Sequence, residues 1–221
     1  MSPTLTGTAR VLAVCGDGTC RAATLERLLA PALGPGVEVV AVGLRAAPGA
    51  AITPGAVGPV LEHGGSVDGF AARRLVPADA LGADLVLALS RAHAADVVRT
   101  APRAARWTFT LRELARLLEG ARVAGRDPAA RVRAAAGTAA RRRADVGPPR
   151  RPEDEDVPDP SDGPAGGFAD SAAVVASAVA VLARVLGPAP ARSAATTAPT
   201  PIAPTTTGTI TDAGRPRPRS S

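Results

Sequence analysis

The chain has 221 residues, of which 46% are hydrophobic and only 2% are aromatic, and it contains no tyrosine. This length allows one ordinary domain with appendages, and its core must be built from Ala, Val and Leu. The formal net charge is +6, but residues 121–151 alone hold nine arginines and two aspartates. The excess charge therefore belongs to one segment, and no aromatic residues are interleaved there as a nucleic-acid surface needs.

The first nine residues lack a charged segment followed by an apolar stretch, so they predict a flexible N-terminus and no signal peptide. We expect no apolar segment to reach the ~18–20 residues that span a bilayer. Cys15 and Cys20 lie in one tight loop, where a structural disulfide would constrain little. These features predict a cytoplasmic protein with reduced thiols and no membrane contact.

Short apolar runs alternate with helical patterns along the first 119 residues. Strands are predicted at 11–15, 37–42, 85–89 and 107–110. Helices are predicted at 20–32, 52–62, 91–99 and 111–119. Alternation over such short connections predicts an α/β fold, a doubly wound four-stranded parallel sheet flanked by helices in three α/β/α layers.

The alternation stops at residue 119 and ends with an Ala/Val-rich closing helix over 169–186. Between them, residues 120–152 form an Arg-rich insertion with weak helical character and no clean apolar face, which we expect to be a solvated, poorly ordered loop. The sequence thus predicts one domain over residues 10–186. The Thr/Pro/Arg-rich residues 187–221 are predicted to be a disordered tail.

The first strand ends in Cys15, a glycine-bearing loop follows, and Arg21 precedes the first helix. In such a sheet a ligand binds beyond the carboxyl ends of the strands. A thiol, backbone N–H groups, a guanidinium and a helix N-terminus all favour an anion there, either a thiolate or a phosphate-like oxyanion. This arrangement suits attack by sulfur on a phosphoryl group. The alternative for Cys15 is a buried, inert thiol.

The segment Val14-Cys-Gly-Asp-Gly-Thr-Cys-Arg21 resembles the phosphate-binding loop of the low-molecular-weight protein tyrosine phosphatases. Later segments resemble that family in the same order, up to an acidic loop that contains Asp159-Pro160. These segments are 39–43, 70–75, 83–93 and 156–160. The resemblance covers about residues 10–186 and implies a phosphatase acting on phosphotyrosine or small aryl phosphates.

The resemblance also implies roles for single residues. Cys15 is the expected nucleophile and forms a cysteinyl-phosphate, Arg21 binds two phosphate oxygens, and Asp159 acts as general acid and then base. The expected phosphate-binding residues are Gly16, Asp17, Gly18, Thr19, Cys20 and Arg21. No metal or organic cofactor is implied, and the expected partner is a phosphoprotein or a small phosphorylated substrate.

Two departures from the family lie in the loop. Asp17-Gly18 stands where the family usually has Gly-Asn, and Gly18 is expected to keep the left-handed backbone conformation. Asp17 adds a negative charge, which weakens anion binding if it points inward. Ala22 replaces a hydroxyl residue that donates to the sulfur, a loss of about 1.5–3 kcal/mol. The alternative function is therefore a catalytically degenerate protein of this fold that binds oxyanions or a phosphoprotein.

Ser161-Asp162 follow Asp-Pro where the family usually has two aromatic residues, and residues 44–53 hold no aromatic residue. We therefore expect a pocket without stacking surfaces for a tyrosine ring, which favours other small aryl or acyl phosphates.

Cys20 has two interpretations. In the family it can bridge to the nucleophile and protect it from over-oxidation, and otherwise it is a small packing residue. Arsenate reductases share the fold but use further downstream cysteines, and none follows Cys20. His63 and His93 are isolated in the sequence, so they are predicted to be helix-surface residues and not metal ligands.

Overall fold

The computed structural model describes residues 7–162 and 167–188. The contacts separate Met1–Ala189 from Pro190–Ser221, and the description below concerns the first unit. Most of the predicted tail lies outside the described residues. The strands are β1 (Ala9–Cys15), β2 (Val37–Gly43), β3 (Leu85–Ala88) and β4 (Thr108–Thr110). The helices are α1 (Arg21–Leu33), α2 (Pro54–Glu62), α3 (Pro77–Leu81), α4 (Arg91–Thr100), α5 (Leu111–Leu118), α6 (Pro128–Val146) and α7 (Gly167–Leu186).

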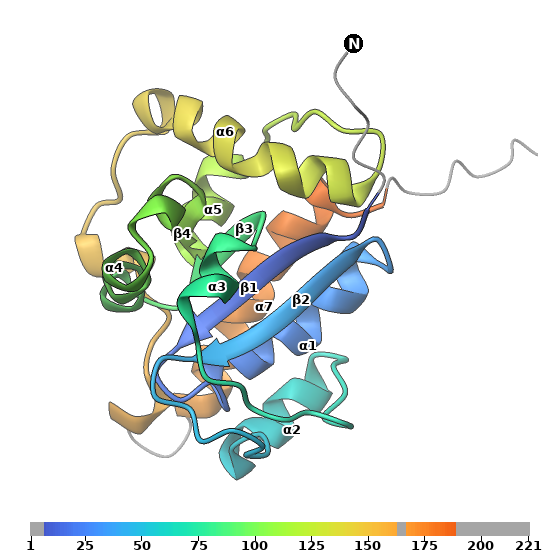
Figure 1. Ribbon diagram of the computed structural model, residues 1–221, viewed down its shortest axis with the longest axis vertical. Helices are drawn as coiled ribbons and strands as arrows, with labels where there is room; N and C mark the ends of the chain where they lie inside the picture. The colour runs from blue at the N-terminus through green and yellow to red at the C-terminus, as the bar shows by residue number, and fades with distance from the viewer. Residues whose placement is uncertain (1–6, 163–166, 189–221) are drawn as a thin grey trace, which may run out of the picture. The chain divides into compact units, whose positions relative to one another are not determined.

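All four strands are parallel and lie in the order β2-β1-β3-β4, which confirms the predicted fold class. Strand β1 is central, because it pairs with β2 on one side and β3 on the other (Figure 1). The direction of winding therefore reverses at β1, the usual place for a ligand in an open α/β sheet. Cys15 is the last residue of this strand.

Side chains alternate along β1 and divide the core into two layers, since successive residues of a strand point to opposite faces. Val11, Ala13 and Cys15 belong to the layer that contains α1, α5, α6 and α7. Leu12 and Val14 belong to the opposite layer, with residues from α3, α4 and the 3₁₀ turn Pro102–Trp107. The face occupied by the Cys15 side chain follows directly from this alternation.

The expectation of a poorly ordered loop in the Arg-rich insertion is wrong, because most of it forms α6, a helix of 19 residues. The expectation that it lacks an apolar face is also wrong. Ala129, Val132, Ala135 and Ala139 are buried against the sheet layer. They recur at helical spacing, but their small size left the pattern weak in the sequence.

Several arginines of α6 hold neighbouring parts of the fold. Arg131 Nε donates to the carbonyl of Leu186 at 3.1 Å, and Arg142 donates to the carbonyl of Glu119 at 3.1 Å. Arg143 donates to a carboxylate oxygen of Glu113 at 2.9 Å. These side chains therefore satisfy carbonyls and a carboxylate of this domain, and part of the local positive charge is neutralised within it.

The expectation that no apolar segment is long enough to span a bilayer is also wrong. Helix α7 has 20 residues, and an 18-residue window within it has a mean hydropathy of 1.8. Its residues Val175, Ala178 and Leu182 are buried, and the helix contacts α1, α2, α5 and α6. A core helix of a globular domain has these same properties.

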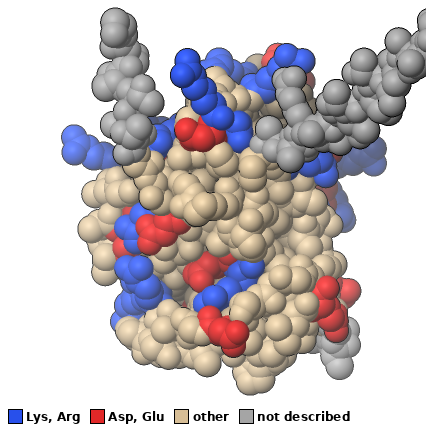
Figure 2. Space-filling model, turned by 90° about the vertical axis from the view of Figure 1, so that its right-hand side faces the viewer, with Lys and Arg blue, Asp and Glu red and all other residues tan. Residues whose placement is uncertain are grey.

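Charge is unevenly distributed on the face shown in Figure 2. Basic side chains gather there toward the end of the molecule where α6 lies in Figure 1, and elsewhere acidic and basic groups adjoin each other. Ion pairs such as Arg10–Glu38 at 3.6 Å and Arg27–Glu26 at 3.4 Å are examples of such neighbours. This face therefore has no single broad basic surface.

Candidate active site

The loop between β1 and α1 curls around the sulfur of Cys15. The backbone N–H of Gly18 donates to Cys15 Sγ at 3.2 Å. Gly18 has a φ of 77°, which confirms the left-handed conformation expected at this position. A Cβ on Gly18 would also lie 2.8 Å from the backbone nitrogen of Gly43. Both the turn and the close approach to β2 therefore require glycine here.

Gly43 makes the reciprocal contact from the end of β2. A Cβ on Gly43 would overlap the carbonyl group of Asp17 and lie 2.6 Å from the nitrogen of Gly18. The loop is also fixed at its far side, because Thr53 N–H donates to the carbonyl of Thr19 at 2.9 Å. The Thr19 and Thr53 hydroxyl oxygens lie 2.9 Å apart. The loop is thus held from two directions before any ligand arrives.

Opposing effects act on the thiol of Cys15, which is 3% exposed. Burial raises its pKa above the ordinary value, and the N–H groups of Ala22, Gly18 and Asp17 and the charge of Arg21 lower it in part. Ala22 is fully buried and has no hydroxyl group to add a further donor. The pKa is raised overall, so the loop compensates the burial incompletely.

Arg21 is the first residue of α1, and its side chain is buried under the acidic loop. Its guanidinium donates to the carbonyl of Val157 at 3.1 Å and also to the carboxylate of Asp159. The N–H of Ser161 donates to the other oxygen of Asp159 at 3.1 Å. The structure therefore brings together Cys15, Arg21 and Asp159, the three predicted catalytic residues.

The acidic loop that carries Asp159 is fixed at several points. Val157 N–H donates to the carbonyl of Leu89, at the end of the third strand, at 2.9 Å. The carboxylate of Asp156 accepts from the backbone N–H of Arg91, at the start of α4, at 2.6 Å. Arg112 of α5 donates to the carbonyl of Asp156 at 3.1 Å. These bonds set the position of Asp159 over the cysteine loop.

The three residues border a cavity of about 120 Å³ whose lining is mostly polar. Of the six predicted phosphate-binding residues, Gly16, Asp17, Thr19, Cys20 and Arg21 line it, and Gly18 lies behind the loop. The other lining residues are Cys15, Arg45, Thr53, His93, Asp159, Ser161 and Phe168. The side chain of Asp17 is exposed, so its charge lies at the rim and not in the interior.

The prediction that His93 is a helix-surface residue is wrong. His93 is 8% exposed, lines the cavity and lies in the first turn of α4. Burial and the charge of Arg21 lower its pKa to about 4, so the imidazole is neutral at neutral pH. Its burial depends on the acidic loop, which is 65 residues further along the chain. No local sequence pattern could reveal that contact.

The pocket also contains an aromatic side chain, contrary to prediction. Phe168, at the start of α7, lines the cavity and packs over Gly55 of α2, where any side chain would overlap its ring. Arg45 was missed as well. Its backbone N–H donates to the carbonyl of Gly16 at 2.8 Å, which places its exposed side chain at the pocket. Phe168 lies nine residues after Asp159, outside the segment where the family resemblance places aromatic residues.

Cys20 and Cys15 are both free thiols. Burial and the neighbouring Cys15 raise the pKa of Cys20 to about 12, so its thiol stays protonated. Within residues 7–162 and 167–188, no three His, Cys, Asp or Glu side chains form a cluster that could hold a metal ion. The chemistry available in the pocket is therefore that of the thiol, the guanidinium and the carboxylate.

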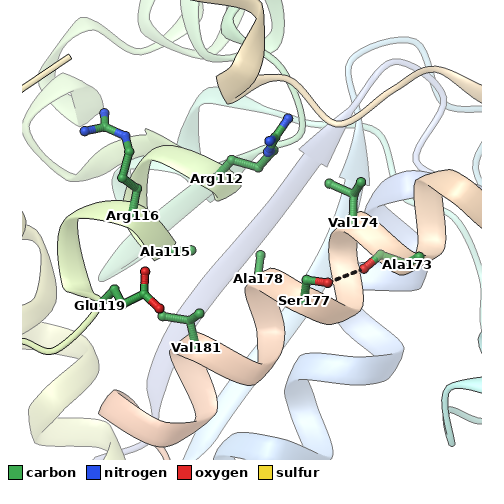
Figure 3. A pocket seen from close by; sticks show the side chains of 9 residues that line it. All are labelled: Arg112, Ala115, Arg116, Glu119, Ala173, Val174, Ser177, Ala178 and Val181. Atoms are coloured by element: carbon green, nitrogen blue, oxygen red, sulfur yellow. Dashed lines mark hydrogen bonds between the residues drawn. The ribbon is translucent and has the colours of Figure 1, made fainter. Parts of the chain in front are cut away.

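A larger hollow of about 490 Å³ lies between α5 and α7. Figure 3 shows Arg112, Ala115 and Arg116 from α5 on one side and Val174 and other residues of α7 on the other. None of the described residues that line it is a cysteine or histidine. Arg116 donates to Glu155 in the acidic loop at 2.6 Å. This hollow lacks a nucleophile and supports the loop from behind.

The fold and the site define a class: α/β proteins with an anion-binding loop of cysteine and arginine at the carboxyl end of the central strand. A family model described as "Low molecular weight phosphotyrosine protein phosphatase" matches residues 10–135, more than half of the chain. The chain belongs to this family.

Relatives and solved structures agree with this assignment. The low molecular weight protein-tyrosine-phosphatase Etp of Escherichia coli K12 is 36% identical over 92 residues, 42% of this chain. The match spans 62% of the length of that curated relative. The YwlE arginine phosphatase from Geobacillus stearothermophilus is 26% identical with a TM-score of 0.57, over 79% of this chain and 90% of that one.

The tyrosine phosphatase Wzb from Escherichia coli K30, solved in complex with sulphate, shares the fold. It has a TM-score of 0.59 and 19% identity, and the match covers 81% of this chain and 99% of Wzb.

Proposed function

We propose that the protein is a phosphatase that hydrolyses phosphotyrosine or small aryl phosphates through a cysteinyl-phosphate intermediate. The observation that carries the proposal is that Cys15, Arg21 and Asp159 border one small cavity. Family membership supports phosphatase chemistry in general. The substrate is a phosphoprotein or a small phosphorylated molecule, and the site of action is the cytoplasm, which the two free thiols support.

In the first step, the backbone N–H groups of residues 16–21 and the guanidinium of Arg21 bind the phosphoryl oxygens. The thiolate of Cys15 attacks phosphorus and the bond to the leaving oxygen breaks. Protonated Asp159 delivers its proton to that oxygen. The products of this step are the released alcohol or phenol, a cysteinyl-phosphate and an Asp159 carboxylate.

In the second step, a water molecule attacks the phosphorus. The Asp159 carboxylate takes a proton from the water, the S–P bond breaks, and the electron pair returns to the sulfur of Cys15. Inorganic phosphate leaves, and Asp159 is protonated again. The cycle needs no group that the pocket does not already hold.

The alternative is a protein that binds oxyanions or a phosphoprotein without turnover. The raised pKa of Cys15 and the missing hydroxyl at Ala22 favour it. The retained general acid opposes it, since a binding protein has no use for a proton donor over the leaving group. The arginine phosphatase relative also raises phosphoarginine as a substrate. The guanidinium of Arg45 at the pocket disfavours that cationic leaving group.

The test is hydrolysis of p-nitrophenyl phosphate, phosphotyrosine and phosphoarginine by the wild type, Cys15→Ser and Asp159→Asn. We expect turnover of the two aryl phosphates in the wild type, none in Cys15→Ser and much less in Asp159→Asn. Equal silence of the reduced, folded wild type and Cys15→Ser would refute the enzyme and favour the binding function. Faster hydrolysis of phosphoarginine than of either aryl phosphate would reassign the substrate.

A further inference from the structure

His93 is a buried polar residue that the proposed reaction cycle does not use. It is 8% exposed and lines the same cavity as Cys15 and Arg21. A buried imidazole is costly unless its nitrogen atoms are hydrogen-bonded. The partners of its two ring nitrogens therefore indicate what it does.

One nitrogen is held by Ser90, the N-cap residue of α4. The hydroxyl oxygen of Ser90 accepts from the backbone N–H of His93 at 3.2 Å and lies 2.8 Å from His93 Nδ1. Because that oxygen already accepts one bond, the hydroxyl proton is available for Nδ1. No other acceptor for this proton is present among the described residues. In this arrangement Nδ1 accepts, and the ring proton is carried by Nε2.

The other nitrogen faces the cysteine loop. A Cβ placed on Gly16 would lie 3.9 Å from His93 Nε2, so the glycine leaves the imidazole edge open to the pocket. Arg45 lies on the same side, with its Nη2 atom 2.8 Å from that Cβ position. The Nε2–H group is thus a donor directed at the space beside Cys15.

We propose that His93 Nε2–H is a substrate-contacting hydrogen-bond donor to the bound oxyanion, oriented by Ser90. This inference rests on the proposed function, since it concerns the same anion site, but it adds a ligand that lies outside the cysteine loop. Ser90 is a positioning residue, because it acts only through the tautomer and orientation of His93. The probe is sulfate, a dianion that does not titrate between pH 4 and 8.

The charge state of His93 makes the proposal measurable. Burial and the charges of Arg21 and Arg45 hold its pKa at about 4, while Asp159 and Asp156 act in the opposite direction. A dianion at Nε2 favours the charged imidazolium, so binding raises the pKa of His93 and takes up a proton. Sulfate affinity therefore increases as the pH falls from 7 toward 4, in addition to any contribution from the carboxylates.

The first experiment needs no substitution, because the chain contains only two histidines. The pKa and tautomer of His93 and His63 are measured by ¹⁵N NMR of the imidazole rings, without and with saturating sulfate. We expect the pKa of His93 to rise and its proton to stay on Nε2. His63, exposed after α2, serves as an internal control and should not change.

The second experiment compares sulfate binding by calorimetry in His93→Leu, His93→Gln, Ser90→Ala and His63→Gln. A hydrogen bond to a charged group corresponds to a loss of roughly tenfold or more in affinity. We expect that loss in His93→Leu, near wild-type binding at pH 7 in His93→Gln, which keeps a donor, and no change in His63→Gln. Ser90→Ala should weaken binding less and let the ring proton move to Nδ1.

Unchanged sulfate affinity in folded His93→Leu, or an unmoved pKa of His93 at saturation, would overturn the proposal. The proposed function fails separately. If sulfate binding shifts His93 but the wild type turns over no phosphate ester, the enzyme is refuted and the anion contact stands. If turnover occurs and His93 is unmoved, only the contact is refuted. If the wild type binds no sulfate, both are overturned.

Discussion

The guanidinium of Arg21 donates to the carboxylate of Asp159, so the two residues expected to act on opposite sides of a phosphoryl group are bonded to each other. The same guanidinium also donates to the carbonyl of Val157, which anchors it in the acidic loop. A substrate phosphate and Asp159 must therefore compete for one side of Arg21. Releasing Asp159 from Arg21 also frees it to receive a proton.

Asp159→Asn should separate these two roles. Loss of the general acid should lower kcat by about 10²–10⁴-fold. The inhibition constant of inorganic phosphate should decrease, since a neutral amide competes less well for Arg21. Steady-state kinetics with p-nitrophenyl phosphate measures both. Asp17→Asn is the matched control, because Asp17 lines the same pocket but is exposed at its rim. If the two variants tighten phosphate binding equally, general electrostatics explains the effect and the competition does not.

Ala22→Ser should return a donor to the sulfur of Cys15. A hydrogen bond to a charged group contributes about 1.5–3 kcal/mol, which corresponds to a fall of about one to two units in the pKa of Cys15. Burial now raises that pKa, so thiolate forms only as the pH rises through the raised value. The alkylation rate with iodoacetamide, measured against pH in a Cys20→Ser background, should shift to lower pH.

Ala23→Ser is the control for Ala22→Ser, since Ala23 is equally buried but packs against Ile52 and Ala56. An unchanged alkylation profile in Ala22→Ser would show that the new hydroxyl does not reach the sulfur. A shift of the same size in Ala23→Ser would point to a general change in the helix.

Phe168→Ala should reduce the preference for aryl phosphates. Aromatic contacts of this kind contribute about 0.5–1.5 kcal/mol, so kcat/KM for p-nitrophenyl phosphate should fall by about two- to twelvefold. The value for glycerol phosphate should change little. Phe70→Ala is the control, because Phe70 stacks with Arg27, 5.3 Å from its ring centre, and does not line the pocket. A parallel loss for both substrates would mean that Phe168 only supports the fold.

Gly43→Ala should destabilise the domain and disturb the cysteine loop, because its Cβ would overlap the carbonyl of Asp17. Overpacking of this kind costs about 1–3 kcal/mol, which thermal unfolding followed by circular dichroism can measure. Gly58→Ala in α2 has no atom within 4 Å of its new Cβ. It should leave the midpoint unchanged or raise it slightly. Equal midpoints for both variants would contradict the close packing of β2 against the loop.

The fold could be predicted from the sequence because its signals are local. Each strand is a short apolar run between helical segments, as at 11–15 and 37–42, and the structure places β1 and β2 there with small shifts at their ends. The cysteine loop was also accessible, since Cys15 and Arg21 lie within seven residues. Asp159 required the family resemblance, because 138 residues separate it from Arg21.

The missed residues share a different property: each reaches the pocket through a contact that no local pattern encodes. His93 is buried because Asp156 and Val157 bond to α4 and β3 beside it. Phe168 reaches the cavity because Gly55 provides space for its ring. Helix α6 was underestimated for another reason, since alanines form most of its buried face and carry little hydrophobic contrast.

Helix α6 also determines how the domain could be rebuilt. Arg133 donates to the carbonyl of Gly7 and Arg131, two residues earlier, donates to the carbonyls of Leu186 and Gly187. The start of β1 and the end of α7 are therefore attached to neighbouring positions of one helix, while Cys15 lies at the other end of β1. Circular permutation, with a short linker joining these ends and new termini in the turn at Gly64, should preserve the pocket.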